Sequence, residues 1–138
     1  MPVDDEQILA EDLIWRGVHS NLTNPCVPDG SGGMRLSSVV FNENSKDKKI
    51  SVWIEKEVTS SGRASSDILD KKYTGILELS AYQIRNPNNL GIEKAPLAEE
   101  PAHGNIYDKE INRSRGRWNK VKRDLARQAR IIIKPAGC

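Results

Sequence analysis

Residues 49–55, KISVWIE, decide the fold class of this chain. Ile50, Val52 and Ile54 alternate with other residues, and this two-residue period is typical of a strand with one buried face. β-Branched side chains at every second position also favour a strand over a helix. The stretch therefore predicts a β-strand whose other face is more polar.

Further strands are predicted on both sides of this stretch. Pro96 places the strand that contains it at a sheet edge, because proline removes a ladder hydrogen bond. Short helices are predicted at residues 65–73 and 81–85, each beginning at or just after a serine that can cap it. The other strands are apolar runs between turn-forming residues, over 13–18, 36–41, 75–79, 90–97, 102–107 and 131–133.

The last third of the chain contains a longer helix, predicted over residues 111–130. Its apolar residues form one narrow stripe, and its opposite side is basic. The predicted fold is therefore α+β, with a mainly antiparallel sheet, a few short helices and one long basic amphipathic C-terminal helix. The residues of this helix expected to bind a partner are Arg117, Lys120, Arg123, Arg127 and Arg130.

Length and composition indicate one domain over residues 1–138. Residues 1–11 form an acidic N-terminal arm, and residues 19–35 form a long loop rich in turn formers. No apolar run approaches the roughly 18 residues of a membrane span, and the N-terminal residues do not resemble a secretory signal. Candidate residues in and beside the long loop are Asp29, Gly30, Ser37 and Ser38.

Cys26 and Cys138 are the two cysteines of the chain. They lie far apart in a sequence without an export signal, so free thiols are expected rather than a disulfide. The cytoplasm is therefore the expected location. No metal or other cofactor is predicted, because the histidines and cysteines lack the close spacing of zinc ligands.

Charge is distributed unevenly along the chain. Residues 1–12 contain five acidic residues and no Lys or Arg, whereas residues 109–134 contain ten basic and two acidic residues. This asymmetry indicates either contact between the two ends or an anionic partner for the basic end. The leading hypothesis is a binding or accessory module that takes nucleic acid or an acidic protein through its C-terminal helix.

Several motifs resemble those of a widespread group of small bacterial proteins that has no assigned activity. The motifs are an L-x-R type strand at Leu13–Arg16, a D-G…S-S…F segment from Asp29 to Phe41, K-x-x-S-V ending at Val52, and P-A-H at Pro101–His103. The resemblance covers most of the chain. It implies a shared fold and family but no activity.

The first strand alone is also similar to the first motif of Arg-Ser-Glu type ADP-ribosyltransferases. This likeness implies that Arg16 holds a phosphate of a dinucleotide, with a serine such as Ser51 supporting the site. A second hypothesis follows, a nucleotide-processing enzyme in which Arg16, Ser51 and His103 share one pocket and His103 acts as general acid or base. A third hypothesis is a toxin, antitoxin or defence component, with an exposed apolar patch or a stable dimer.

Each of these residues also has a simpler interpretation. Arg16 is a strand charge that pairs with an acid such as Glu55 or Glu78 on a neighbouring strand. His103 is a loop histidine that bonds to the backbone. The basic helix is a solvated surface that balances the acidic N-terminus.

Overall fold

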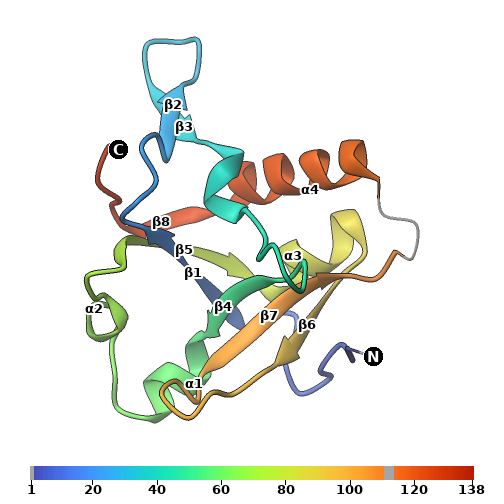
Figure 1. The fold of residues 1–138 in the computed structure, drawn as a ribbon. Coiled ribbons are helices and arrows are strands. Elements are labelled where there is room, and N and C mark those ends of the chain that lie inside the picture. Colours follow the sequence, from blue (N-terminus) through green and yellow to red (C-terminus); the bar gives the residue numbers. More distant parts are fainter. Residues whose placement is uncertain (1, 111–113) are drawn as a thin grey trace.

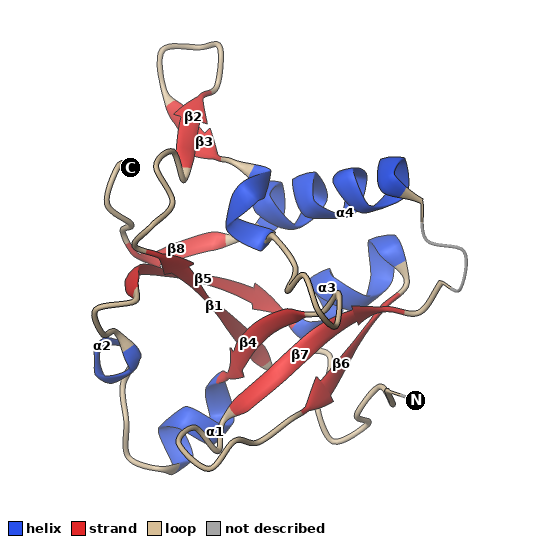
Figure 2. Ribbon diagram, viewed as in Figure 1, coloured by secondary structure: helices blue, strands red, loops and turns tan. Residues whose placement is uncertain are grey.

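The alternating stretch at residues 49–55 forms strand β4 (Ile50–Ile54) in a six-stranded antiparallel sheet (Figure 2). The computed structural model describes residues 2–110 and 114–138. The strand order is β6-β7-β4-β1-β5-β8, so β4 and β1 lie at the centre. The predicted α+β fold is confirmed. The other strands of this sheet are β1 (Leu13–His19), β5 (Tyr73–Ser80), β6 (Leu90–Lys94), β7 (His103–Asp108) and β8 (Arg130–Ile133).

The segment after the first strand differs from the prediction. β2 (Cys26–Pro28) and β3 (Met34–Leu36) form a separate hairpin within and beyond the expected loop. The expected strand over 36–41 is wrong, because Ser37 caps a 3-10 helix, η1 (Ser38–Phe41), by accepting a hydrogen bond from the Val39 N–H. A short apolar run fits either conformation, and the serine cap favours the helix.

The described residues contain four α-helices between the strands: α1 (Glu55–Ser60), α2 (Ser65–Ile68), α3 (Ala81–Asn88) and α4 (Arg115–Gln128). α1 was not predicted, because residues 55–60 show no apolar repeat of helical period. α4 is the predicted basic helix, although residues 111–113 lie outside the described part of the chain. Arg130 was expected in this helix but begins β8.

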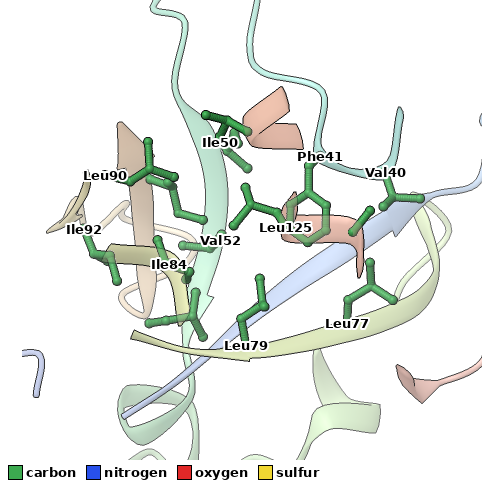
Figure 3. Packing of buried hydrophobic residues seen from close by; sticks show 14 of the residues in the cluster. Val40, Phe41, Ile50, Val52, Leu77, Leu79, Ile84, Leu90, Ile92 and Leu125 are labelled. Atoms are coloured by element: carbon green, nitrogen blue, oxygen red, sulfur yellow. The ribbon is translucent and has the colours of Figure 1, made fainter. Parts of the chain in front are cut away.

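Helices cover both faces of the sheet (Figure 1). α3, α4 and η1 pack on one face, where Phe41, Ile84 and Leu125 join the larger apolar cluster (Figure 3). α1 and α2 contribute Val58 and Ile68 to a smaller cluster on the other face. The candidate pocket described below is lined by Trp53 and Ile68 of this smaller cluster.

The acidic N-terminal arm lies along the edge strand β6. The Asp5 N–H donates to the Ile92 carbonyl at 2.8 Å, and the Asp4 carboxylate accepts from the Ile92 N–H at 3.0 Å. Asp4 also pairs with Arg85 and Lys109. In the described residues, the arm forms no ion pair with α4, but Lys109, in the basic segment 109–134, pairs with Asp4, so the two oppositely charged ends of the chain do meet at this point.

A disulfide joins Cys26 to Cys138 across 112 positions of sequence, with a Cα–Cα distance of 5.3 Å. The expectation of free thiols is therefore wrong. The tail after β8 runs beside the base of the hairpin, and a sequence separation cannot reveal that proximity. The disulfide removes the main reason for expecting a cytoplasmic location, because such bonds persist mainly in oxidising compartments.

In the part of the chain that the structure describes, no helix has the length and apolar character needed to cross a membrane.

Candidate functional site

The two central strands, β1 and β4, pair over only part of their length. Their register joins Ile14 to Ile54 and Trp15 to Trp53, and no further pair follows toward Ser51. Figure 1 shows the strands close together at one end and spread apart at the other. The separation leaves backbone carbonyls of β4 without a strand partner.

Arg16 fills the space between the separated strands. Its Nη1 donates to the Ser51 carbonyl at 2.7 Å, its Nε to the Val40 carbonyl at 3.0 Å, and its Nη2 to the Asn42 carbonyl at 3.1 Å. One side chain thus ties β1 to β4 and to the C-terminal end of η1. The expected ion pair with Glu55 or Glu78 is wrong, since Glu78 bonds Trp15 and Arg130 instead.

The charge of Arg16 has no carboxylate partner among residues 2–110 and 114–138. Burial disfavours the charged form and lowers the pKa of Arg16 to about 10. The guanidinium is therefore still charged at neutral pH. A guanidinium has five N–H groups, and three of them donate to described carbonyls. A half-buried cation with unused donors favours an anion nearby.

Arg16, Ser51 and His103 line one pocket of about 350 Å³. The structure thus brings together the three residues that the enzyme hypothesis placed in one site. Ser51 contributes its carbonyl to Arg16, and its hydroxyl has no partner in the described chain. The catalytic role of the three residues stays a prediction.

His103 has a defined orientation in this pocket. Its Nδ1 lies 2.7 Å from the Ala95 carbonyl. A carbonyl can only accept, so Nδ1 carries the proton and the neutral ring has its lone pair on Nε2. The backbone bond expected for a loop histidine is present. It leaves Nε2 without a partner among the described residues, on a side chain that lines the pocket.

An aromatic pair forms another wall of the pocket. Trp53 on β4 and Tyr73 on β5 meet edge to face at a ring-centroid distance of 5.1 Å, although β1 lies between their strands. They meet above Gly17, where an added Cβ would lie 2.6 Å from Tyr73 and 2.8 Å from Trp53. Sequence reasoning did not find this pair. The available signal was a glycine within a strand, which often marks a close approach.

Glu100 closes the pocket on the side of the loop before β7. It accepts two hydrogen bonds from Arg63, at 2.8 and 2.7 Å, and one from Trp53 Nε1 at 3.1 Å. The Arg63 hydrogen bonds are the largest cause that lowers the pKa of Glu100 below its ordinary value. Glu100 therefore holds the tryptophan of the aromatic pair in place.

Replacing Glu100 with glutamine is expected to lower the free energy of unfolding by about 1–2 kcal/mol at neutral pH, through loss of the charged bonds to Arg63. Because the pKa of Glu100 is lowered in the folded state, its contribution is present above the ordinary value of 4.5 and is lost as pH falls through the lowered pKa. Urea unfolding of wild type and variant at neutral pH and near pH 3 measures the difference in stability and its decrease at low pH. A difference between wild type and Glu100→Gln that persists undiminished at low pH would contradict this assignment.

The predicted binding residues on α4 differ in their availability. Arg117 donates to both carboxylate oxygens of Asp108, at 3.1 and 2.6 Å, and is half-buried. Lys120 and Arg127 both pair with Asp124. Burial alone would raise the pKa of Asp124, but the hydrogen bonds from Lys120 and Asn88 lower it. Arg117, through its two bonds to Asp108, therefore has a structural role.

Arg123 and Arg127, together with Arg35, line a second hollow, here called the arginine groove. Arg130 lies outside it and pairs with Glu78. The groove has a volume of about 550 Å³ and lies where the C-terminal half of α4 faces β3 and β8. Arg123 is exposed and has no ion-pair partner in the described chain, and Arg127 has a side chain that is 74% exposed. The lining comprises Arg35, Leu36, Ser38, Arg123, Ala126, Arg127, Ala129 and Ile131.

The candidate loop residues have local roles in the turns. Asp29 and Gly30 belong to the tip of the β2–β3 hairpin, where the Asp29 carboxylate accepts from Ser31 and Gly33. The backbone hydrogen bond from Ser31 is the largest cause that lowers the pKa of Asp29. Ser37 caps η1, and Ser38 lines the arginine groove. These residues do not join Arg16 in its pocket.

Across residues 2–110 and 114–138, no cluster of three or more His, Cys, Asp or Glu side chains could hold a metal ion. No protein-family model matches this sequence, and no curated protein or solved structure matches it either, so the family resemblance seen in its motifs stays an expectation.

Proposed function

We propose that the protein is a binding module that takes an acidic, partly apolar segment of another protein into the arginine groove. The observation that supports this function is the lining of the groove, where Arg35, Arg123 and Arg127 surround an apolar floor. Guanidinium groups favour carboxylates, with which they form paired hydrogen bonds. An apolar floor favours apolar side chains, which a protein segment can supply along with carboxylates.

Exposed apolar side chains next to the groove support the same partner. Met34 is 54% exposed on β3, and Ile131 is 41% exposed on β8. Of the two, Ile131 lines the groove itself, and Met34 precedes the lining residue Arg35 in sequence. An exposed apolar side chain beside a basic rim is typical of a partner surface. The lining holds no aromatic side chain on which a base could stack, which favours protein over nucleic acid.

The edge of the sheet offers a backbone template for this segment. β8 pairs with β5 on one side, and its other side has no backbone hydrogen bond to any described residue. The opposite edge strand, β6, is covered by the N-terminal arm. An extended peptide that adds to β8 would pass Ile131 and place alternate side chains in the groove.

A peptide titration tests this proposal. A short labelled peptide that alternates glutamate with valine is expected to bind at about 50 mM salt and to weaken at about 200 mM, because the contact is electrostatic. The double change Arg123→Glu, Arg127→Glu should weaken binding by about tenfold or more, since it introduces like charges. Lys46→Glu with Lys71→Glu is the matched control, because it alters the net charge equally at exposed sites elsewhere.

Two results would overturn the proposal. One is the absence of peptide binding at low salt. The other is tighter binding of a single-stranded oligonucleotide that the same double change weakens, which would assign the groove to nucleic acid. Fluorescence anisotropy measures both probes under the same conditions.

A further inference from the structure

The pocket beside Arg16 is separate from the arginine groove, and it contains features that a structural role does not explain. Its charged lining residues Asp70, Lys72 and Glu99 are exposed, and Glu100 is already paired with Arg63. Arg16 is the remaining charged group of the lining. Its three bonds go to neutral carbonyls, so the pocket wall holds a cation that no described acid neutralises.

The wall next to this cation is flat and apolar. Gly17 has no side chain, so the rings of Trp53 and Tyr73 pack against the backbone of β1 and face the pocket together with Ile68 and Leu97. Paired aromatic side chains in a concave site bind planar groups well. Since the Trp53 Nε1–H already donates to Glu100, the wall offers ring surface and not a second indole donor.

Polar groups around the wall have unused hydrogen-bonding capacity. Ser51, Tyr73 and His103 line the pocket, and the Ser51 hydroxyl, the Tyr73 hydroxyl and His103 Nε2 bond to no other described residue. Such groups complete a small-molecule site when they converge on an apolar surface. They would fix the orientation of a ring held between them.

From these features we propose that the pocket binds a small aromatic anion, with its flat ring against Trp53 and Tyr73 and its carboxylate or phosphate on Arg16. A pocket of about 350 Å³ is at the small end of the usual range for ligand sites, which begins near 300 Å³. This size suits a molecule of one or two rings. The proposal does not depend on the arginine groove.

A smaller hollow of about 290 Å³, which is not the arginine groove, extends the space beyond Arg16. It shares Arg16, Gly17, Ser51 and Tyr73 with the first pocket and continues toward His19 and Asn44. A phosphate carried on a sugar reaches further from its ring than a carboxylate attached directly to a ring. The two hollows together therefore allow both sources of the anion, and the experiment separates them.

Nuclear magnetic resonance titration with matched probes tests the proposal. One pair is 4-hydroxybenzoate with 4-hydroxybenzyl alcohol, and the other is adenosine 5′-monophosphate with adenosine. The anion of at least one pair should shift the Gly17 and Ser51 amides and the Trp53 indole N–H. Its neutral counterpart should bind about tenfold or more weakly, because a charged hydrogen bond is lost. The pair that responds identifies a carboxylate or a phosphate.

Variants assign the binding to this pocket. Tyr73→Leu should lower the affinity for the anion by about fivefold. Tyr82→Leu, which removes an exposed ring on α3, should leave this affinity unchanged. Arg16→Lys should weaken it by about tenfold or more, since a lysine lacks the guanidinium fork. Gly17→Ala forces the rings of Trp53 and Tyr73 to move while every charge is kept, so it should also lower the affinity for the anion.

Three outcomes would overturn the proposal. The first is that no probe shifts the pocket amides at concentrations up to about 5 mM, which is beyond weak specific binding. The second is that each neutral counterpart binds as tightly as its anion. The third is that a bound anion is insensitive to Tyr73→Leu and Gly17→Ala, both shown by their amide spectra to be folded.

Discussion

Replacing Arg16 with methionine is expected to lower the free energy of unfolding by about 3–5 kcal/mol. The change keeps an apolar stem of similar length and removes the three bonds to the carbonyls of Val40, Asn42 and Ser51. Each bond from a charged donor contributes about 1.5–3 kcal/mol. Part of the sum over the three bonds is offset, because the variant no longer pays for desolvating a charge and because water can reach the freed carbonyls at this half-buried site. Urea unfolding monitored by circular dichroism measures the loss.

Two further variants separate the bonds of Arg16 from its charge. Arg16→Lys keeps the cation but cannot reach three carbonyls at once, so it should recover less than half of the loss. Arg35→Met removes an exposed arginine of the hairpin and should change stability by about 0.5 kcal/mol or less. If Arg16→Met were as stable as wild type, Arg16 would not hold the separated strands together.

The elements with the strongest periodic patterns were predictable from sequence. β4 alternates strictly, and α4 has a narrow apolar stripe in which Trp118, Val121 and Leu125 are all buried. Both patterns arise because each element buries one face against the rest of the domain, and burial of one face leaves its period in the sequence. β6 is at a sheet edge as predicted, but it ends at Lys94, so Pro96 lies beyond it and is not what excludes a further ladder.

The interactions of the candidate site were less predictable, because they depend on distant parts of the chain. Arg16 bonds to carbonyls 24 to 35 positions away, and any residue type can supply a carbonyl. Trp53 and Tyr73 lie on strands that do not pair, and they touch only because Gly17 has no side chain between them. Sequence patterns indicated Arg16, Ser51 and His103 separately, and the strand order places them together.

The disulfide is a further feature that no local pattern predicts, and its removal should have the second large effect on stability. Cys138→Ser is expected to lower the free energy of unfolding by about 3–5 kcal/mol, because the bond closes a loop of 112 positions and a loop near that length restricts the unfolded chain strongly. The effect should reach the arginine groove, since Cys26 anchors the base of the hairpin that carries β3.

Urea unfolding with and without a reducing agent tests this expectation. Reduction should destabilise the wild type to the level of the double variant Cys26→Ser, Cys138→Ser, and should leave that variant unchanged. Amide hydrogen exchange should show the larger loss of protection in β2 and β3, where the cross-link holds the hairpin to the C-terminal tail. Two alkylated cysteines, counted by mass spectrometry in protein purified under alkylating conditions, together with a stability that does not respond to reduction, would show that the native chain works without this bond and would restore the case for a reducing compartment.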